Sequence, residues 1–256
     1  MPVLFTYTPS DDGTDENLLI LLHGLGDTHV QFGKLGKSLK LPQTATLAIC
    51  APLQLPYFDT PAFQWYPSFT LLGEPITHPN PSSAVTLLST VFTYLTSEAC
   101  GWEAEKVHLF GFGQGGTVCV EFGLVHWQQQ LAKWRGGNGT GAGLGSITTI
   151  AGPLISFPTL SKLSHTPLLV FHRAPSQAVS PGNDIGGEGN EMTLPASAFT
   201  AFRKGYANIQ ETRGGAKGGM PASTGEWEPI MRFWSERLGR RREEGLYEVL
   251  SGRTPI

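Results

Sequence analysis

A glycine-rich turn near the middle of the chain has the residue types and spacing that could support chemistry. The sequence GFGQGG, residues 111–116, follows an apolar run that starts at Val107 and precedes a segment of helix length. Gly111, Gly113 and Gly116 match G-x-G-x-x-G, which in dinucleotide-binding folds seats a pyrophosphate on the amino end of a helix. The same turn matches G-x-S-x-G, the elbow that presents a catalytic serine between a strand and a helix, with Gly113 at the serine position.

The dinucleotide interpretation lacks its usual acidic residue. An Asp or Glu about 20 residues after the glycines holds the ribose in such sites, but no acidic residue lies between Glu121 and Asp184. In the elbow interpretation, glycine relieves a backbone strain of about 1–3 kcal/mol but supplies no nucleophile. A tight strand–helix turn without any chemistry is the third interpretation, and it is compatible with either motif.

Short apolar runs alternate with helix-length segments along the chain, a pattern that favours a mainly parallel sheet covered by helices. The expected strands are Leu18–Leu22, Thr46–Cys50, Val107–Phe110, Ile147–Ile150 and Leu168–Phe171. The expected helices are Phe32–Leu39, Ser82–Glu98, Gln114–Trp134, Ala196–Lys204 and Glu226–Arg237. Five buried strands with intervening helices predict one doubly wound α/β domain.

We expect this domain to span residues 1–239, followed by a C-terminal tail, residues 240–256, that begins with charges of mixed sign. Two segments rich in glycine, residues 136–145 and 181–190, interrupt the alternation without an apolar face of their own. They are interpreted as insertions within the domain and not as linkers between domains.

Composition excludes several classes of protein. Hydrophobic residues make up 40% of the 256 residues, and the formal net charge of −3 argues against a nucleic-acid binder. The three cysteines are too few and too scattered for a disulfide scaffold or a Cys-x-x-Cys metal site, and we expect no metal and no cofactor. No apolar run reaches the length of a transmembrane segment, and the start lacks a signal peptide. The sequence therefore predicts a cytoplasmic protein, with the nucleus as a further possible location.

A second motif, LLHGLGDT over residues 21–28, ends the first apolar run. Together with GFGQGG and with PLLVFHR over residues 167–173, it resembles the acyl-protein thioesterase and phospholipase/carboxylesterase branch of the α/β-hydrolase family. The resemblance covers most of the chain and implies an α/β-hydrolase fold. It also implies an oxyanion hole, formed by backbone amides after the first buried strand and after the nucleophile. Here those donors would be the amides of Leu25 and Gln114.

The resemblance also implies a Ser–Asp–His triad, and all three of its positions are vacant. The serine position is Gly113, the acid position falls at Ser176, and the histidine position falls at Pro221 in the loop before the last helix. The vacancy of the base does not depend on the alignment, because none of the seven histidines follows His172. Without an activated nucleophile and a general base, covalent acyl transfer loses its main route. We therefore predict a catalytically inactive member of the family.

Other residues could support a relocated site. Cys119 lies within the elbow helix, where we expect it to face the core, and His23 is expected to brace its own loop instead of serving as a base. The candidate pocket residues are His23, Gly24, Asp27 and Trp65. Trp65 belongs to an aromatic-rich stretch, residues 56–73, that could line an acyl pocket or pack on the core.

Three hypotheses follow. The first is a non-catalytic protein that binds a small acyl or carboxylate ligand or a protein partner. The second is an active ester or thioester hydrolase with a relocated catalytic constellation, for instance His23 with Cys119. The third is a protein-interaction module that binds through the aromatic stretch.

Overall fold

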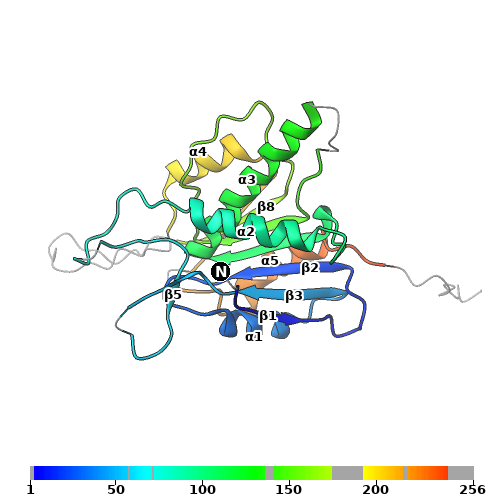
Figure 1. Ribbon diagram of the computed structural model, residues 1–256, viewed down its shortest axis with the longest axis horizontal. Coiled ribbons are helices and arrows are strands. Elements are labelled where there is room, and N and C mark those ends of the chain that lie inside the picture. The colour runs from blue at the N-terminus through cyan, green and yellow to red at the C-terminus, as the bar shows by residue number, and fades with distance from the viewer. Residues whose placement is uncertain are drawn as a thin grey trace, which may run out of the picture.

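A computed structural model describes residues 3–56, 58–70, 72–135, 141–174, 193–215 and 218–241. These residues form a seven-stranded sheet with the order β1-β3-β2-β6-β7-β8-β9, which is parallel except for β1 (Figure 1). The strands are β1 (Phe5–Thr8), β2 (Asn17–Leu22), β3 (Thr44–Ile49), β6 (Val107–Phe112), β7 (Ser146–Ile150), β8 (Leu168–Arg173) and β9 (Ile209–Gly214). The predicted α/β-hydrolase architecture, a doubly wound, mainly parallel sheet in a single domain, is confirmed.

Helices cover both faces of the sheet. One face packs against α2 (Ser82–Leu95), α3 (Gln114–Arg135) and α4 (Ala196–Gly205), and the other packs against α1 (His29–Leu39) and α5 (Thr224–Ser235). The central strands are buried along their whole length, as in β2, because a helix lies on each side of them. A hairpin of two short strands, β4 (Leu53–Gln54) and β5 (Phe63–Gln64), and a short 3₁₀ turn (Ala104–Lys106) complete the described elements.

The five expected strands are all present in the centre of the sheet, and the sheet has two further strands that were not predicted, one at each edge. β1 alternates between exposed and half-buried positions, and most of β9 (IQETRG) is also exposed or half-buried. An edge strand tolerates polar and charged residues because it has one unpaired side. Such strands lack the continuous apolar run by which the five central strands were recognised.

The predicted helices are all present, with ends shifted by a few residues. The second ends at Leu95 instead of Glu98, and the last runs from Thr224 to Ser235. Ser223 caps the last helix by accepting a hydrogen bond from the backbone amide of Glu226. The predicted insertion at residues 181–190, the first half of the one at 136–145 and most of the tail lie outside the described residues. Of the helices that the structure describes, none combines the length and the apolar character needed to cross a bilayer.

Candidate functional site

The glycine-rich turn joins β6 to α3 at the carboxyl edge of the sheet. Gly113 has a φ of +51°, in the left-handed region, as a residue at the tip of a strained strand–helix turn would. Its amide donates to the carbonyl of Ile150 at 2.9 Å, and its carbonyl accepts from the amide of Thr117 at 3.0 Å. A Cβ atom placed on Gly113 would meet no heavy atom within 4 Å. The turn therefore has the geometry of an elbow, with open space where a side chain would stand.

The neighbouring glycines are required by packing. A Cβ atom on Gly115 would overlap the carbonyl oxygens of Leu22 and His23, and one on Gly111 would overlap the backbone of Gly115. The first turn of α3 thus lies directly against the end of β2 and against its own preceding strand. This close approach is what the flanking glycines of an elbow provide.

The two predicted oxyanion donors belong to the turn itself and to the loop after β2. Leu25 follows β2, and its side chain is 41% exposed. The hydrogen bonds recorded for the described residues include no acceptor for its amide, whereas the next residue, Gly26, donates to the carbonyl of Phe63 at 2.9 Å. Gln114 is the first residue of α3, a position whose amide has no acceptor within the helix. Both amides remain candidates for binding an oxygen atom of a ligand.

The side chain of Gln114 connects the elbow to the aromatic stretch. Its Oε1 accepts from the amide of Trp65 at 2.9 Å, and its Nε2 donates to the carbonyl of Tyr66 at 2.9 Å and to the hydroxyl of Ser68 at 2.7 Å. The indole of Trp65 is completely buried and donates to the carbonyl of His23 at 2.8 Å. Trp65 is therefore a buried residue that connects its own segment to the end of β2 and to the start of α3.

Other aromatic side chains of the same stretch are exposed. Phe58 is 63% exposed and Phe69 is 50% exposed, while Tyr66 is buried beside Trp65. Burial raises the pKa of the Tyr66 hydroxyl to about 12, so it stays protonated at neutral pH. The aromatic stretch is thus divided between a packed inner part and an outer part that contacts solvent. Tyr57 lies outside the described residues.

His23 is buried and both of its ring nitrogens have partners. Nδ1 lies 2.7 Å from the carbonyl of Gly24 and therefore carries the proton, while Nε2 accepts from the amide of Ala51 at 3.0 Å. Burial lowers the pKa of the imidazole, which keeps it neutral. Asp27 holds the same loop through the amide of Thr28, at 2.7 Å. These contacts brace the loop and leave no free nitrogen on His23 to accept a proton from a nucleophile.

Cys119 is completely buried within α3, as expected, and burial raises the pKa of its thiol well above the usual value. Such a thiol is a poor nucleophile because the thiolate is the reactive form. The described residues contain one buried imidazole next to a hydroxyl, His108 with Ser146 at 2.8 Å. Both residues are inaccessible, and they lie where β6 and β7 begin, at the edge opposite the elbow. This pair is placed for packing and not for catalysis.

The loop that contains the base position of the resemblance contacts the end of β8. Ser176 lies outside the described residues, but Arg173, the last residue of β8, is 1% exposed. Its guanidinium donates to the carboxylate of Glu226 and to the carbonyls of Gly219 and Met220, the latter two at 2.9 and 2.7 Å from Nη2. A buried arginine therefore fixes the loop in which the family's histidine is expected.

Pro221 belongs to this fixed loop and is buried. Its carbonyl accepts from the indole of Trp227 at 2.9 Å, and the amide of the next residue, Ala222, donates to Glu226 at 2.9 Å. The amide of Ala222 and the guanidinium of Arg173 hold the pKa of the Glu226 carboxyl below its usual value. The resulting cluster, which we call the Arg173–Glu226 brace, comprises Arg173, Gly219, Met220, Ala222 and Glu226.

The sequence interpretation did not include the brace. Its signals were an arginine that ends an otherwise apolar strand, and the capping pattern S-x-x-E over residues 223–226. The capping pattern places Glu226 at the start of the last helix, but nothing in the sequence shows that Arg173 reaches it. No group of three or more His, Cys, Asp or Glu side chains within the described part of the chain is arranged to hold a metal ion.

Comparison with known proteins agrees with this geometry. The family model for phospholipase/carboxylesterase matches residues 7–145. The chain is 35% identical over 241 residues to "Uncharacterized hydrolase UM10204" of Mycosarcoma maydis, covering 93% of this chain and 82% of that protein. This chain belongs to the phospholipase/carboxylesterase family. A second relative, "Uncharacterized hydrolase C9G1.08c" of Schizosaccharomyces pombe, is 33% identical over 235 residues, covering 89% and 86% of the two chains.

Solved structures of an esterase and of a thioesterase share the fold at low sequence identity. Esterase PE8 superposes with a TM-score of 0.67 at 18% identity, covering 93% of this chain and all of the other. Acyl-protein thioesterase 2 of Zea mays superposes with a TM-score of 0.66 at 17% identity, covering 92% and 99% of the two chains. The resemblance inferred from the three sequence motifs is confirmed at the level of the family and the fold.

Proposed function

We propose that this member of the phospholipase/carboxylesterase family binds an acyl, carboxylate or peptide-like ligand at the elbow without hydrolysing it. The observation that carries the proposal is Gly113 at the tip of an intact elbow. The backbone has the left-handed geometry of a nucleophile position and open space above it, but no side chain to attack a carbonyl. A ligand oxygen near the amides of Leu25 and Gln114 would accept hydrogen bonds there, but residue 113 has no side chain that could attack the ligand.

The Arg173–Glu226 brace supports the same conclusion. The loop before α5 is fixed by a buried arginine and contains no histidine, and the sequence has none after His172. A histidine therefore cannot act as the general base from that loop. The three cysteines, all free, fit a reducing compartment, for which we propose the cytoplasm or the nucleus.

An active hydrolase with relocated catalytic groups is the second candidate, favoured by the printed names of both relatives, which are called hydrolases. It would need an accessible imidazole within hydrogen-bond reach of a hydroxyl or thiol. Among the described residues, Thr77 and His78 form an exposed contact of 3.1 Å between adjacent side chains in a surface loop. Both side chains of that contact are open to solvent and are not enclosed in a site.

Hydrolysis measurements separate the two candidates. Purified full-length protein, Gly113→Ser and the matched control Gly113→Ala are assayed with p-nitrophenyl acetate, p-nitrophenyl octanoate and a palmitoyl thioester. We expect all three proteins to stay at the buffer rate, because the hydroxyl of Gly113→Ser has no general base to activate it. Any turnover by the wild type within the ordinary enzyme range, about 1–10³ s⁻¹, would overturn the proposal. His23→Ala would then show whether that imidazole is the relocated base.

Ligand binding is tested separately by nuclear magnetic resonance. We expect octanoate to shift the backbone amide signals of Leu25 and Gln114 in the wild type, with saturation. Gly113→Trp, which places a bulky side chain in the open space, should abolish these shifts. If octanoate leaves both amide signals unchanged in the wild type, the elbow does not bind carboxylates and this part of the proposal is wrong.

A further inference from the structure

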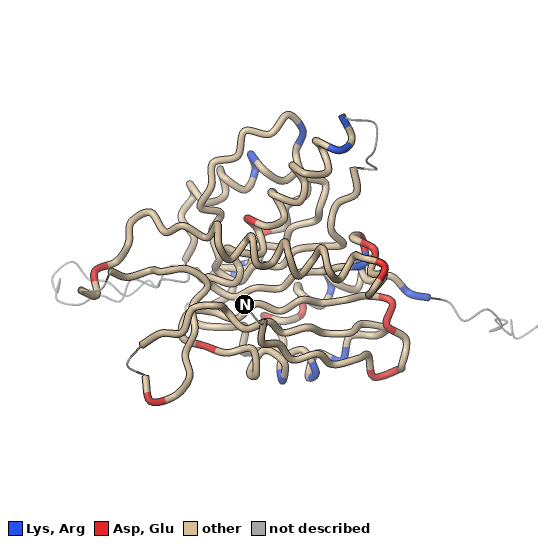
Figure 2. Tube along the Cα trace, in the orientation of Figure 1, with Lys and Arg blue, Asp and Glu red and all other residues tan. Residues whose placement is uncertain are grey.

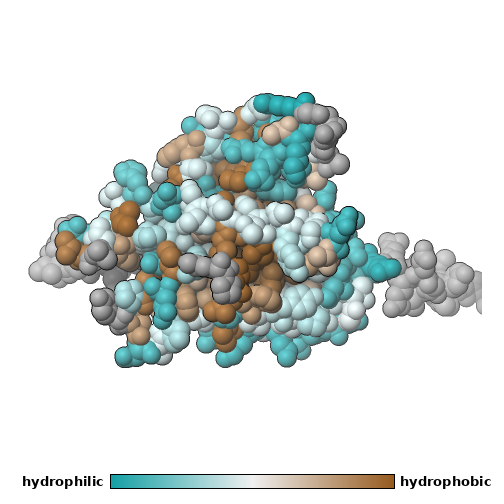
Figure 3. Space-filling view, in the orientation of Figure 1, coloured by the Kyte–Doolittle hydropathy of each residue, from teal (hydrophilic) through white to brown (hydrophobic). Residues whose placement is uncertain are grey.

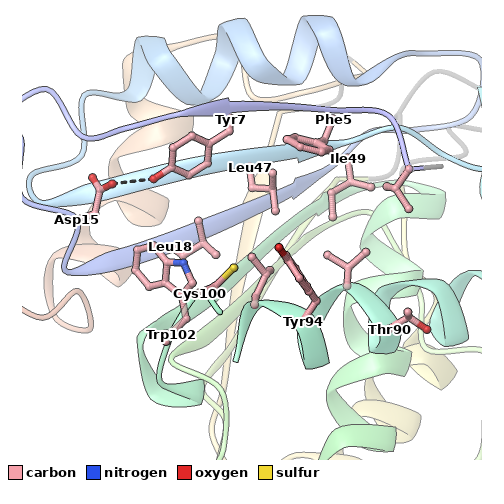
Figure 4. A pocket seen from close by; sticks show the side chains of 14 residues that line it. Phe5, Tyr7, Asp15, Leu18, Leu47, Ile49, Thr90, Tyr94, Cys100 and Trp102 are labelled. Atoms are coloured by element: carbon pink, nitrogen blue, oxygen red, sulfur yellow. Dashed lines mark hydrogen bonds between the residues drawn. The ribbon is translucent and has the colours of Figure 1, made fainter. Parts of the chain in front are cut away.

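A large apolar groove lies between β1 and α2, on the face of the sheet away from α1 and α5. Its volume is about 900 Å³, at the upper end of the range typical of small-molecule sites. Leu18, Leu47 and Ile49 form its floor, and Val91 and Leu95 of α2 form one wall (Figure 4). The elbow is at the carboxyl edge of the central strands, so the groove is a separate site.

The groove exists because the sheet ends at β1. α1 packs against β1 and β3 on the opposite face, whereas α2 has its main helical contacts with α3. Hydrophobic surface therefore gathers below α2, between that helix and the edge of the sheet (Figure 3). Phe5 is 58% exposed, Tyr7 is 45% exposed and Tyr94 is 63% exposed. Aromatic side chains grouped and exposed in this way on one surface are typical of binding sites.

One end of the groove carries a negative charge. The hydroxyl of Tyr7 donates to Oδ2 of Asp15 at 2.7 Å, and the amide of Ser10 donates to Oδ1 at 2.8 Å. Partial burial raises the pKa of Asp15, but these hydrogen bonds lower it further and hold it below its usual value. The carboxylate is therefore ionised at neutral pH. Two hydrogen bonds also fix the orientation of the carboxylate at the mouth of an otherwise apolar groove.

No lysine or arginine among the described residues forms a salt bridge with Asp15. The nearby cation Lys106 pairs with Glu16 instead, at 2.5 Å. Asp11, Asp12, Asp15 and Glu16 all lie in the connection from β1 to β2. Figure 2 shows acidic residues along this connection, at the end of the molecule where β2 and β3 begin. Within the described part of the chain, therefore, no salt bridge neutralises the charge of Asp15.

Aromatic rings lie near this carboxylate. Tyr7 and Trp102 lie at the same end of the groove as Asp15, while Phe5 and Thr90 lie toward the other end (Figure 4). A carboxylate grouped with aromatic rings can recognise an ammonium group, through charge attraction and cation–π contacts. An apolar floor beyond it would remove a hydrocarbon chain from water, which favours binding.

We propose that this groove binds an amphipathic amine. Its ammonium group lies against Asp15, and its hydrocarbon chain lies over Leu47 and Val91. A fatty acid of the same length would place its own carboxylate beside Asp15 and is disfavoured by like-charge repulsion. The site thus differs in ligand charge from the one proposed at the elbow, and its test does not depend on that proposal.

Titration of the full-length protein with decyltrimethylammonium, decanoate and 1-decanol tests the assignment. Binding is followed through the indole signal of Trp102 and the amide signals of β1, so that a ligand at the elbow does not contribute. We expect saturable shifts with decyltrimethylammonium, and at least tenfold weaker binding of decanoate to these residues. Equal binding of the three probes, or no shift with the cation, would overturn the proposal.

Two variants locate the site. Asp15→Asn should weaken binding of the cation at least fivefold and leave that of decanol unchanged, because it removes the charge but retains an acceptor for Tyr7. Val91→Trp should fill the groove and abolish binding, whereas Thr93→Trp, at an exposed position of the same helix, should bind like the wild type. If Val91→Trp fails to fold, Asp15→Asn still decides: unchanged cation affinity in that variant contradicts the proposal.

Sedimentation of the wild type and of Val91→Trp tests whether a second copy of this chain, instead of an amine, occupies the groove. A monomer in both cases is expected. A concentration-dependent dimer that is lost in Val91→Trp would assign the groove to a second copy of this chain and overturn the proposal.

Discussion

The carboxyl edge of the sheet contains two regions that differ in how far they keep the framework of a hydrolase. At the elbow, the left-handed turn, the close packing of α3 on β2 and the bracing of the Leu25 loop by His23 and Trp65 are all present. The residue at the tip of this turn, Gly113, has no side chain. At the end of β8, by contrast, the Arg173–Glu226 brace fills the space between that strand and the loop before α5.

The difference shows that the two regions would respond differently to substitution. The elbow is held by backbone packing that does not involve the residue at its tip, so a side chain could be added at Gly113 without displacing another atom. The β8 end is held by a buried ion pair and its hydrogen bonds, so no single substitution there would create a base without removing a structural contact. The following predictions test this contrast, beginning with the largest expected effect.

Arg173→Met removes the cation from the brace, so that Glu226 loses its ion-pair partner and the carbonyls of Gly219 and Met220 lose the guanidinium donor. Breaking a buried ion pair from one side costs about 3–5 kcal/mol, so we expect a loss of about 3 kcal/mol in the free energy of unfolding. Chemical denaturation measures it. The control is Arg213→Met, which removes a 68% exposed arginine paired with Glu211 and should cost less than about 1 kcal/mol. Equal losses in the two variants would mean that the brace does not hold the β8 end.

Gly115→Ala tests the backbone packing of the elbow. The added methyl group would overlap the carbonyl oxygens of Leu22 and His23, which are backbone atoms and cannot rotate away. We expect a loss of about 2–3 kcal/mol in the free energy of unfolding, typical of overpacking in a rigid interior.

Gly113→Ala is the matched variant in the same turn. It meets open space and should cost only the strain of a left-handed alanine, about 1–2 kcal/mol. Thermal and denaturant unfolding of the two variants give the comparison. A larger loss for Gly113→Ala than for Gly115→Ala would contradict the interpretation that packing, and not the residue at the tip, holds the turn.

The smallest effect concerns pH. The amide of Ala222 and the guanidinium of Arg173 lower the pKa of Glu226 from its ordinary value of 4.5 in the folded protein. A carboxylate with a lowered pKa contributes stability that is present above pH 4.5 and is lost as the pH falls through the folded pKa. The stability difference between wild type and Glu226→Gln should therefore shrink as the pH decreases below 4.5. A difference that stays constant from neutral to acid pH would show that the Glu226 charge does not stabilise the brace.

The sequence predicted the central part of the fold because buried parallel strands are continuous apolar runs. Leu18–Leu22 and Leu168–Phe171 could be recognised without any partner. β1 and β9 could not, because an edge strand is exposed on one side and its composition resembles that of a loop. The predicted bracing role of His23 is supported by two backbone hydrogen bonds, and both follow from its position at the end of β2.

The sequence by itself determined the family, the elbow and the absence of a histidine after His172, because each is a matter of residue identity at a short spacing. Only the tertiary structure decided what fills the β8 end, because Arg173 and Glu226 are 53 residues apart and meet only when β8 and α5 pack together. The groove between β1 and α2 was likewise decided by tertiary structure, since its Asp15 and Trp102 come from separate connections. A ligand site built from distant segments leaves no local pattern, because its residues share a position in space and not a spacing along the chain.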